Sequence, residues 1–252
     1  MATTILRIEK LRKTYPNGNK EVLTGLDLTI GQGEIYGFLG PNGAGKTTTV
    51  NILAGLLKQD SGNIEIFGKP VASDRKNTMR RVGFVPQSIA IYPELTAYEN
   101  LSVFGSVYGI SRPELTNRIG KLLDLFGLEK FRDKKAASFS GGMKRSLNLM
   151  VGILHNPDLL ILDEPTVGID VQSKVVILEY LKTLNSHGTT ILYTSHDMEE
   201  AEHLCTRVGI IDGGKLVAAD SPEALARRFP ECHDLKSVYL ELTGKELRTM
   251  ED

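Results

Sequence analysis

The hydrophobic and polar positions of this chain change their spacing several times, and each spacing predicts a different kind of element. Apolar and polar residues alternate over 5–11 and 22–30, as they do in half-exposed strands of an antiparallel sheet. Apolar runs at 34–39, 82–85 and 189–194 predict further strands. Residues 159–162 are all aliphatic, which predicts a strand buried on both faces. Segments 61–68 and 207–219 predict a turn with a strand and a hairpin around Gly213-Gly214.

The pattern becomes helical between about 88 and 157. Apolar residues there recur at three- and four-residue spacing, and Gly109, Pro113 and Gly127 separate the periodic stretches. Further helices are predicted at 173–185, 222–228 and 235–242. We therefore expect an α/β fold with one domain over residues 1–220, a helical subdomain inserted at about 88–157, and a short helical tail over 221–252.

Residues 40–48 carry the strongest chemical signal. Two glycines separated by four residues are followed by Lys46 and Thr47, which is the phosphate-loop pattern. Its glycines let backbone N–H groups converge on a phosphate, its lysine reaches the β- and γ-phosphates, and its hydroxyl ligates Mg²⁺. The pattern lies between a predicted strand and a predicted helix, so it predicts a nucleoside-triphosphate site. The expected binding residues are Gly40, Pro41, Asn42, Gly43, Ala44, Gly45, Lys46, Thr47 and Thr48.

Polar side chains follow three of the predicted strands. Gln87 comes after 82–85, Asp163-Glu164 after 159–162, and His196 after 189–194. Ligands of open α/β sheets bind at the carboxyl ends of the strands, so we expect these groups and the phosphate loop to form one site. Asp163 suits Mg²⁺, Glu164 suits a water-activating base, and Gln87 suits a metal or water contact. Asp163 and Glu164 have an alternative interpretation as helix-capping acids.

Two further signals are weak when taken alone. Tyr15 lies upstream of the phosphate loop, where an aromatic ring either packs on the sheet or stacks on a purine. Ser140-Gly141-Gly142 precedes an apolar helix, and serine before a helix is a common cap.

Composition narrows the class of protein. Thirty basic and thirty-one acidic residues leave a net charge of −1, which argues against broad attraction to nucleic acid or to an anionic membrane surface. Two cysteines are too few for a disulfide scaffold and suit a reducing compartment. No apolar run approaches the roughly 18–20 residues that span a bilayer, and the N-terminus lacks a secretory signal. We therefore expect the chain in the cytoplasm.

In their order along the chain, these motifs resemble the nucleotide-binding subunit of an ABC transporter. The resemblance extends from Tyr15 to about Ala219 and implies a P-loop NTPase ABC cassette, with a RecA-like mixed-sheet core, an N-terminal antiparallel β-subdomain and a helical signature subdomain. The motifs that match are the aromatic loop at Tyr15, Walker A at 40–48, the Q-loop at Gln87, the signature at Ser140–Gly142, Walker B at 159–163, the base Glu164, the D-loop at 167–170 and the switch histidine His196.

The resemblance also implies cofactors, partners and roles. ATP and Mg²⁺ would bind between two cassettes, in a homodimer or heterodimer, with Ser140, Gly141 and Gly142 of one cassette facing the γ-phosphate held by the other. An integral-membrane permease subunit would hold the chain at the inner face of the cell membrane. The implied catalytic residues are Glu164, His196, Gln87 and Lys46, and the implied metal-contacting residues are Thr47, Gln87 and Asp163.

The sequence departs from the family pattern around its signature. Phe139 and Met143 replace the usual Leu and Gln, and Lys144-Arg145-Ser146 replaces the commoner Arg-Gln-Arg. Because Ser140-Gly141-Gly142 is intact, we expect catalysis to survive without the polar contact of the usual Gln. Such variants, a Gly-Ile-Asp D-loop and a tail like 238–244 resemble the export-type branch of the family.

The stretch Ser88–Thr96 is apolar for a loop and contains Pro93. Either Ile89, Ile91, Tyr92 and Leu95 pack under the helical subdomain, or the stretch lines a groove for a short helix of the membrane subunit.

Two other functions are possible for a protein with these motifs, and each would require sequence features that differ from those of this chain. Family members that act on nucleic acid or ribosomes insert a long coiled coil or join two cassettes, whereas about fifty residues separate Gln87 from Ser140 here. We therefore expect no nucleic-acid partner. A clamp that binds ATP without hydrolysis conflicts with the intact Glu164, His196 and Lys46.

Overall fold

The computed structural model describes residues 3–16 and 20–244, which fall into two compact units. The phosphate-loop unit joins Met1–Thr78 to Thr190–Asp252, and the helical unit is Met79–Thr189. The expected domain boundaries at 88, 157 and 220 stay a prediction, and residues 245–252 of the expected tail lie outside the described part of the chain.

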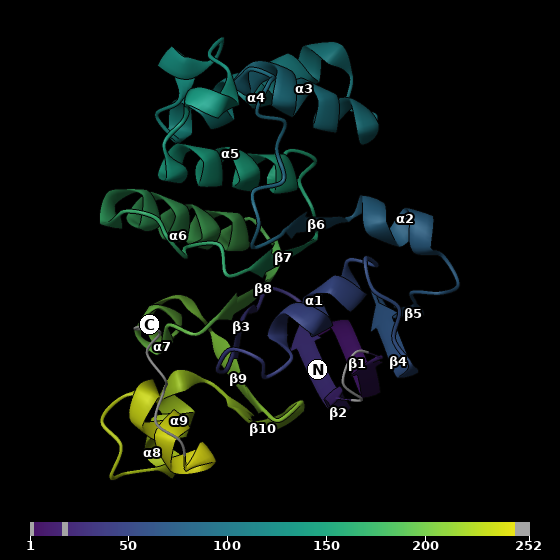
Figure 1. The fold of residues 1–252 in the computed structure, drawn as a ribbon, viewed down its shortest axis with the longest axis vertical. Helices are drawn as coiled ribbons and strands as arrows, with labels where there is room; N and C mark the ends of the chain where they lie inside the picture. Colours follow the sequence, from purple (N-terminus) through teal and green to yellow (C-terminus); the bar gives the residue numbers. More distant parts are fainter. Residues whose placement is uncertain (1–2, 17–19, 245–252) are drawn as a thin grey trace. The chain divides into compact units, whose positions relative to one another are not determined.

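An antiparallel sheet opens the phosphate-loop unit, with strand order β2-β1-β4-β5 (Figure 1). Its long strands are β1 (Thr4–Tyr15) and β2 (Lys20–Gly31), followed by β4 (Ser61–Ile66) and the short β5 (Lys69–Pro70). Leu26, Leu28 and Ile30 are buried on β2 and alternate with exposed residues, so the predicted alternation is confirmed.

A mixed sheet forms the centre of the same unit, in the order β10-β9-β3-β8. β3 (Ile35–Leu39) is parallel to β8 (Thr190–Ser195) and to β9 (Arg207–Asp212), and β10 (Lys215–Asp220) is antiparallel to β9. Every residue of β3 and β8 is buried, as strands covered on both faces require. The helices of this unit are α1 (Lys46–Leu53), α7 (Met198–Leu204), α8 (Pro222–Arg228) and α9 (Leu235–Thr243).

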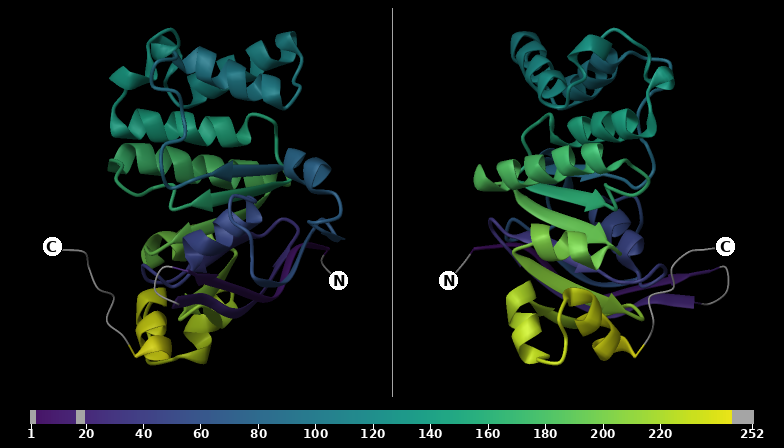
Figure 2. Two further views of the ribbon diagram at one scale, coloured as in Figure 1. Left: turned by 45° about the vertical axis from the view of Figure 1, so that its right-hand side comes forward. Right: turned by 90° about the vertical axis from the view of Figure 1, so that its left-hand side faces the viewer.

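The C-terminal helices belong to the phosphate-loop unit. Both α7 and α8 contact α9, and α8 contacts β10, an arrangement that Figure 2 shows in yellow and green. Leu225, Leu235, Val238 and Tyr239 are buried there, so α8 and α9 pack into the core of this unit.

The helical unit contains the parallel pair β6 (Val82–Val85) and β7 (Leu159–Asp163). Its helices are α3 (Ala97–Val107), α4 (Arg112–Leu125), α5 (Gly141–Ile153) and α6 (Val171–Ser186), with 3-10 turns at Glu129–Phe131 and Ala136–Ser138. Helix α5 contacts α3, α6 and β6 and thus lies between them. The prediction that this segment is mainly helical is confirmed.

Two short helices were not predicted, α2 (Arg75–Arg80) at the boundary of the units and α7. Helices of this length have little intrinsic stability and leave a weak periodic signal. Among the described residues, no helix is long and apolar enough to cross a membrane.

Candidate functional site

The phosphate loop connects β3 to α1, as predicted, and its glycines are required by geometry. Gly43 and Gly45 have φ of 82° and 111°, values that side-chain-bearing residues rarely adopt. A Cβ on Gly45 would lie 2.7 Å from Leu23 Cδ2, and one on Gly40 would collide with the carbonyl oxygen of Ile211. The loop can therefore lie close to β2 and β9 only because these positions lack side chains.

Helix α1 begins without a side-chain cap, because its N-cap residue is Gly45. Lys46 is only 4% exposed, and its Nζ donates to the carbonyl oxygens of Gly40 at 2.8 Å and Pro41 at 3.3 Å. An uncapped helix N-terminus beside an ammonium group favours an anion. The arrangement can bind a phosphate group.

The structure brings Tyr15 to the same helix. Its Oη lies 3.3 Å from Thr48 Oγ1, and 37% of the residue is exposed. A stacking role for the ring therefore stays a prediction.

His196 follows the strand next to the phosphate loop. Leu39 pairs with Ser195 in the parallel register of β3 and β8, so the loop and His196 leave the same edge of that sheet. Asp197 N donates to Ser195 Oγ at 2.9 Å, and Asp197 caps α7 through Glu200 N at 3.0 Å. These bonds fix the backbone on both sides of the exposed His196.

Gln87 contacts one of the two predicted carboxylates, Glu164, in the helical unit. Val85 pairs with Leu162 across β6 and β7, and Gln87 Nε2 donates to Glu164 Oε2 at 3.2 Å. Asp163 and Glu164 are 2% and 5% exposed. Glu164 has φ of 48°, a left-handed conformation that is uncommon outside glycine and is often retained at functional sites.

The helix-capping alternative for these acids is wrong for the helix that follows them. Asp170 is the N-cap of α6, and its side chain accepts from Ser173 N at 2.9 Å. Burial of two carboxylates is costly unless polar or cationic groups face them, and oxygen donors are the ligands that Mg²⁺ prefers. Asp163 in this unit and the exposed Thr47 hydroxyl at the start of α1 are therefore chemically suited to Mg²⁺.

Ser140 is the N-cap of α5, as predicted, and its Oγ accepts from Met143 N at 3.3 Å. Ser140 and Gly141 are exposed, whereas Gly142 is buried. A Cβ on Gly142 would lie 2.6 Å from Ser173 Oγ, so this glycine allows the starts of α5 and α6 to approach each other. The start of α5 is thus an accessible helix N-terminus.

Two polar residues of α5 that were not predicted as site residues contact the loop that carries Gln87. The guanidinium of Arg145 donates to the carbonyl oxygen of Gln87 at 2.6 Å, and Asn148 Oδ1 accepts from Ala90 N at 2.9 Å. Burial lowers the pKa of Arg145, and the nearby charge of Glu164 opposes that shift. Lys144 and Ser146 of the same helix are polar as well, so the sequence carried no signal that distinguished Arg145 and Asn148 as contacts of this loop.

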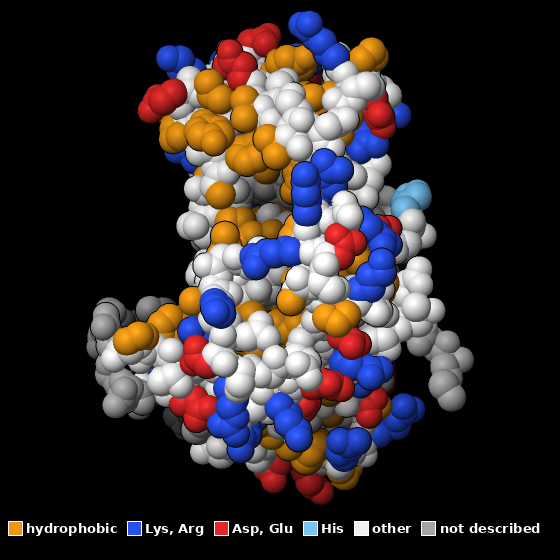
Figure 3. Space-filling view, turned by 90° about the vertical axis from the view of Figure 1, so that its right-hand side faces the viewer, with side chains coloured by type: hydrophobic (Ala, Val, Ile, Leu, Met, Phe, Trp, Pro, Cys, Tyr) orange, Lys and Arg blue, Asp and Glu red, His pale blue; other side chains and the backbone are white. Residues whose placement is uncertain are grey.

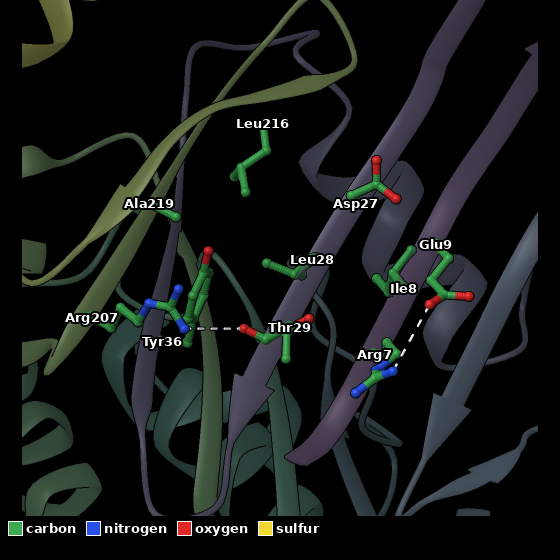
Figure 4. A pocket seen from close by; sticks show the side chains of 10 residues that line it. All are labelled: Arg7, Ile8, Glu9, Asp27, Leu28, Thr29, Tyr36, Arg207, Leu216 and Ala219. Atoms are coloured by element: carbon green, nitrogen blue, oxygen red, sulfur yellow. Dashed lines mark hydrogen bonds and ion pairs between the residues drawn. The ribbon is translucent and has the colours of Figure 1, made fainter. Parts of the chain in front are cut away.

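A separate hollow of about 400 Å³ lies near the amino-terminal end of β3, away from the phosphate loop at its other end (Figure 4). Arg207 lies there over the ring of Tyr36, and burial raises the pKa of Tyr36. None of the predicted site residues lines this hollow.

Comparisons with known proteins agree with this geometry. Residues 23–167 match the ABC transporter family. The linearmycin resistance ATP-binding protein LnrL of Bacillus subtilis is 45% identical over 225 residues, which are 89% of this chain and 72% of that protein. The Nod factor export ATP-binding protein I of Cupriavidus metallidurans is 41% identical over 250 residues, 99% of this chain and 80% of that protein.

Solved structures show the same fold. An ATP-binding subunit of an ABC transporter superposes with a TM-score of 0.87 at 31% identity, covering 95% of this chain and 99% of that one. A dimeric ATP-binding cassette in a post-hydrolysis state, bound to ADP and Pi, gives a TM-score of 0.79 at 27% identity, covering 86% and 98%. This chain therefore belongs to the ABC transporter family, as an ATP-binding subunit with the fold of the family's ATPase cassette.

Proposed function

We propose that two such cassettes, identical or homologous, close on ATP and that the cycle of closure and hydrolysis drives a separate membrane permease that exports its substrate. The observation that carries the proposal is the position of Gln87. Its side chain contacts Glu164 at 3.2 Å, and its backbone continues directly into the apolar stretch Ser88–Thr96. One residue thus joins the proposed base to the proposed docking surface. The export direction is supported by the names of the relatives, linearmycin resistance and Nod factor export.

The residues of the phosphate loop bind the triphosphate in this proposal. Backbone N–H groups of 40–48 and the start of α1 face the phosphate oxygens, and Lys46 turns from its carbonyl partners to the β- and γ-phosphates. Thr47, Asp163 and Gln87 would hold Mg²⁺, and the bound ion would supply positive charge opposite the phosphates. Tyr15 stacks on the purine.

Glu164 acts as the general base. Its carboxylate accepts a proton from the attacking water, which Gln87 and His196 help to orient. The buried position of Glu164 and its contact with Gln87 support this assignment. Hydrolysis requires dimer closure, because the exposed Ser140-Gly141 start of α5 completes the site of the opposite cassette.

The membrane subunit docks on Ser88–Thr96 in the helical unit. The backbone of this stretch is held by side chains: Tyr92 N donates to Asn100 Oδ1 at 2.7 Å, and Ala90 N to Asn148 at 2.9 Å. Ile89 and Tyr92 are nevertheless 39% and 51% exposed. Apolar side chains on a fixed, accessible backbone suit a helix-in-groove contact.

Two further observations bear on this docking surface. The ring of Tyr92 stacks on Phe104 with centroids 5.7 Å apart, and Ile91 and Leu95 are half-buried, so the packing alternative holds for part of the stretch. Hydrophobic side chains gather on the helical unit, in the upper part of Figure 3. Docking of the membrane subunit on Ser88–Thr96 places the chain on the inner face of the cell membrane.

Turnover of a Glu164→Gln variant tests the proposed chemistry. The amide keeps the shape of the site but accepts no proton, so kcat should fall by roughly 10²–10⁴-fold while ATP binding persists. The variant should also accumulate as an ATP-stabilised dimer in size-exclusion chromatography. Glu179→Gln, on the exposed part of α6, is the matched control. Near-normal ATPase activity of Glu164→Gln would remove Glu164 from the role of base.

Co-purification of membrane proteins tests the docking surface. Tyr92→Asp should abolish recovery of an integral-membrane permease from detergent-solubilised membranes, with ATPase activity and thermal stability nearly unchanged. Leu125→Asp is the control, because Leu125 is also 51% exposed but lies at the end of α4. If Tyr92→Asp unfolds or still binds the permease, the docking surface lies elsewhere.

A further inference from the structure

The polar face of α5 holds two segments of the helical unit that are far apart in the sequence. Arg145 donates through one nitrogen to the carbonyl oxygen of Gln87 at 2.6 Å, and at 3.5 Å to that of Pro86. Its other terminal nitrogen donates to the carbonyl oxygen of Val167 at 3.3 Å. Val167 is three residues past Glu164. A single guanidinium therefore contacts both the backbone of Gln87 and the segment that follows the proposed base, Glu164.

The chemistry of this contact is specific to arginine. Arg145 is only 7% exposed, and a buried cation is tolerated only where acceptors face it. Bonds from a charged donor are stronger than neutral ones. The planar fork of the guanidinium can reach two carbonyl groups at once, whereas a lysine ammonium acts as a point charge.

Asn148 holds the same loop one helical turn further on. Its Oδ1 accepts from Ala90 N at 2.9 Å, and its Nδ2 donates to the carbonyl oxygen of Pro86 at 3.4 Å. Residues three apart lie on one face of a helix. Arg145 and Asn148 therefore bond to the backbone of 86–90 from the same face of α5, at Pro86, Gln87 and Ala90.

We propose that Arg145 and Asn148 are positioning residues that fasten the Gln87 loop to the signature helix α5. Their bonds make the start of α5, the Gln87–Glu164 contact and the first part of Ser88–Thr96 move as one body. Neither residue is among the groups proposed above to contact nucleotide. The proposal rests on the roles of Gln87 and Glu164 proposed above and adds the residues that keep those side chains in place.

Substitution of Arg145 separates turnover from binding. Arg145→Met leaves the carbonyl groups of Gln87 and Val167 without their cation and frees the loop. We expect kcat to fall by roughly 10- to 100-fold, because a displacement of about 1 Å at a reacting group can cost 10²-fold. The KM for ATP should stay nearly unchanged, since the phosphate loop lies in the other unit. Arg118→Met is the matched control, because Arg118 also donates to a backbone carbonyl, that of Leu154, at 2.8 Å in the same unit.

Rescue by lysine sharpens the test. Arg145→Lys keeps the positive charge but lacks the second nitrogen that would reach the other carbonyl group. Its kcat should therefore lie between those of Arg145→Met and the wild type, and its melting temperature should be close to that of the wild type. This variant also carries the test if Arg145→Met fails to fold. A well-folded, fully active Arg145→Met would overturn the proposal, and where Arg145→Met does not fold, wild-type kcat in Arg145→Lys would overturn it.

A double-mutant cycle shows whether Arg145 acts through Gln87. Gln87→Ala removes the side chain but keeps the carbonyl that Arg145 bonds. If Arg145 positions that side chain, Arg145→Met should lower kcat much less in the Gln87→Ala background than in the wild type. Fully additive losses would contradict the proposal and indicate an independent effect.

The same measurements distinguish this inference from the proposed function. Full turnover in both Gln87→Ala and Glu164→Gln would refute the proposed catalytic roles themselves. Reduced turnover in those two variants, combined with normal turnover in Arg145→Met, would refute only the positioning role of Arg145.

Discussion

The two units each contain a helix whose N-terminus is proposed to face phosphate, and the two helices begin differently. In the phosphate-loop unit, the N-cap of α1 is Gly45, which supplies no side-chain bond, and Lys46 lies buried beside it. In the helical unit, the N-cap of α5 is Ser140, whose hydroxyl already accepts from Met143 N. Helix α1 thus combines a start that has no side-chain cap with a lysine in the same loop, whereas α5 is capped by the side chain of its own Ser140.

This difference indicates that the two helices act at different steps. The start of α1 can hold nucleotide within a single cassette, because loop, helix and lysine are contiguous in the sequence. The start of α5 is instead proposed to contact a phosphate that is bound by another cassette. Substitutions at the two helix starts should therefore differ in which step they block.

Lys46→Ala should have the largest effect, because it removes binding and with it closure and turnover. Loss of a charged hydrogen-bonding group costs about 1.5–3 kcal/mol, or roughly 10- to 100-fold in ATP affinity. Isothermal titration calorimetry measures that affinity. Lys182→Ala, at an exposed position on α6, should bind normally. A Lys46→Ala protein that binds ATP as tightly as the wild type would remove the contrast between α1 and α5.

Ser140→Arg should block closure and turnover but spare binding to the monomer. The larger, charged side chain at the start of α5 obstructs the opposite cassette, while α1 and its loop are unchanged. Equilibrium ATP binding and ATP-dependent dimerisation separate these effects. Ser111→Arg is the control, because Ser111 is the exposed N-cap of α4.

Mixing Ser140→Arg with Lys46→Ala protein sharpens this comparison. A heterodimer retains at best one composite site, built from the intact Lys46 of one chain and the intact Ser140 of the other. Partial recovery of turnover on mixing is therefore expected. An isolated Ser140→Arg monomer that hydrolyses ATP at full rate, independent of protein concentration, would show that α5 does not act on the opposite cassette.

The smallest predicted effect concerns acid stability of the helical unit. Burial, with a contribution from the charge of Arg118, lowers the pKa of His155 from 6.5 to about 4, although its bond to the carbonyl oxygen of Val82 opposes the shift. The unfolded chain then binds more protons than the folded one between these values. The free energy of unfolding should therefore be highest above pH 6.5 and fall as the pH drops towards 4.

Chemical denaturation at several pH values checks this prediction. The ring of His155 stacks on Tyr108 with centroids 3.7 Å apart, so His155→Phe keeps an aromatic partner and removes the titration. The fall in stability between pH 6.5 and 4 should be shallower in this variant than in the wild type. An equal pH dependence in the two proteins would contradict the assignment, and His187→Gln, at an exposed histidine, serves as control.

The sequence by itself determined the elements and motifs whose causes are local. Strand β6 and helix α8 have the predicted bounds. The signals that set these bounds, an apolar run for β6 and Pro222 with its neighbouring turn residues for α8, lie within a few positions of the element itself. The phosphate loop was predictable because its glycines, lysine and hydroxyl are contiguous. Ser140 was predictable as a cap for the same reason.

Only the tertiary structure decided which distant groups meet. Gln87 and Glu164 are 77 residues apart and in contact, and Arg145 reaches Gln87 across 58 residues. Phe139, which departs from the family pattern, is 5% exposed and packs edge-on against Phe131. Its side chain is therefore part of the hydrophobic core. Periodicity records how much of a side chain is buried but not which partner buries it. A buried guanidinium therefore left no pattern in the sequence, because its acceptors are backbone carbonyls that every residue possesses.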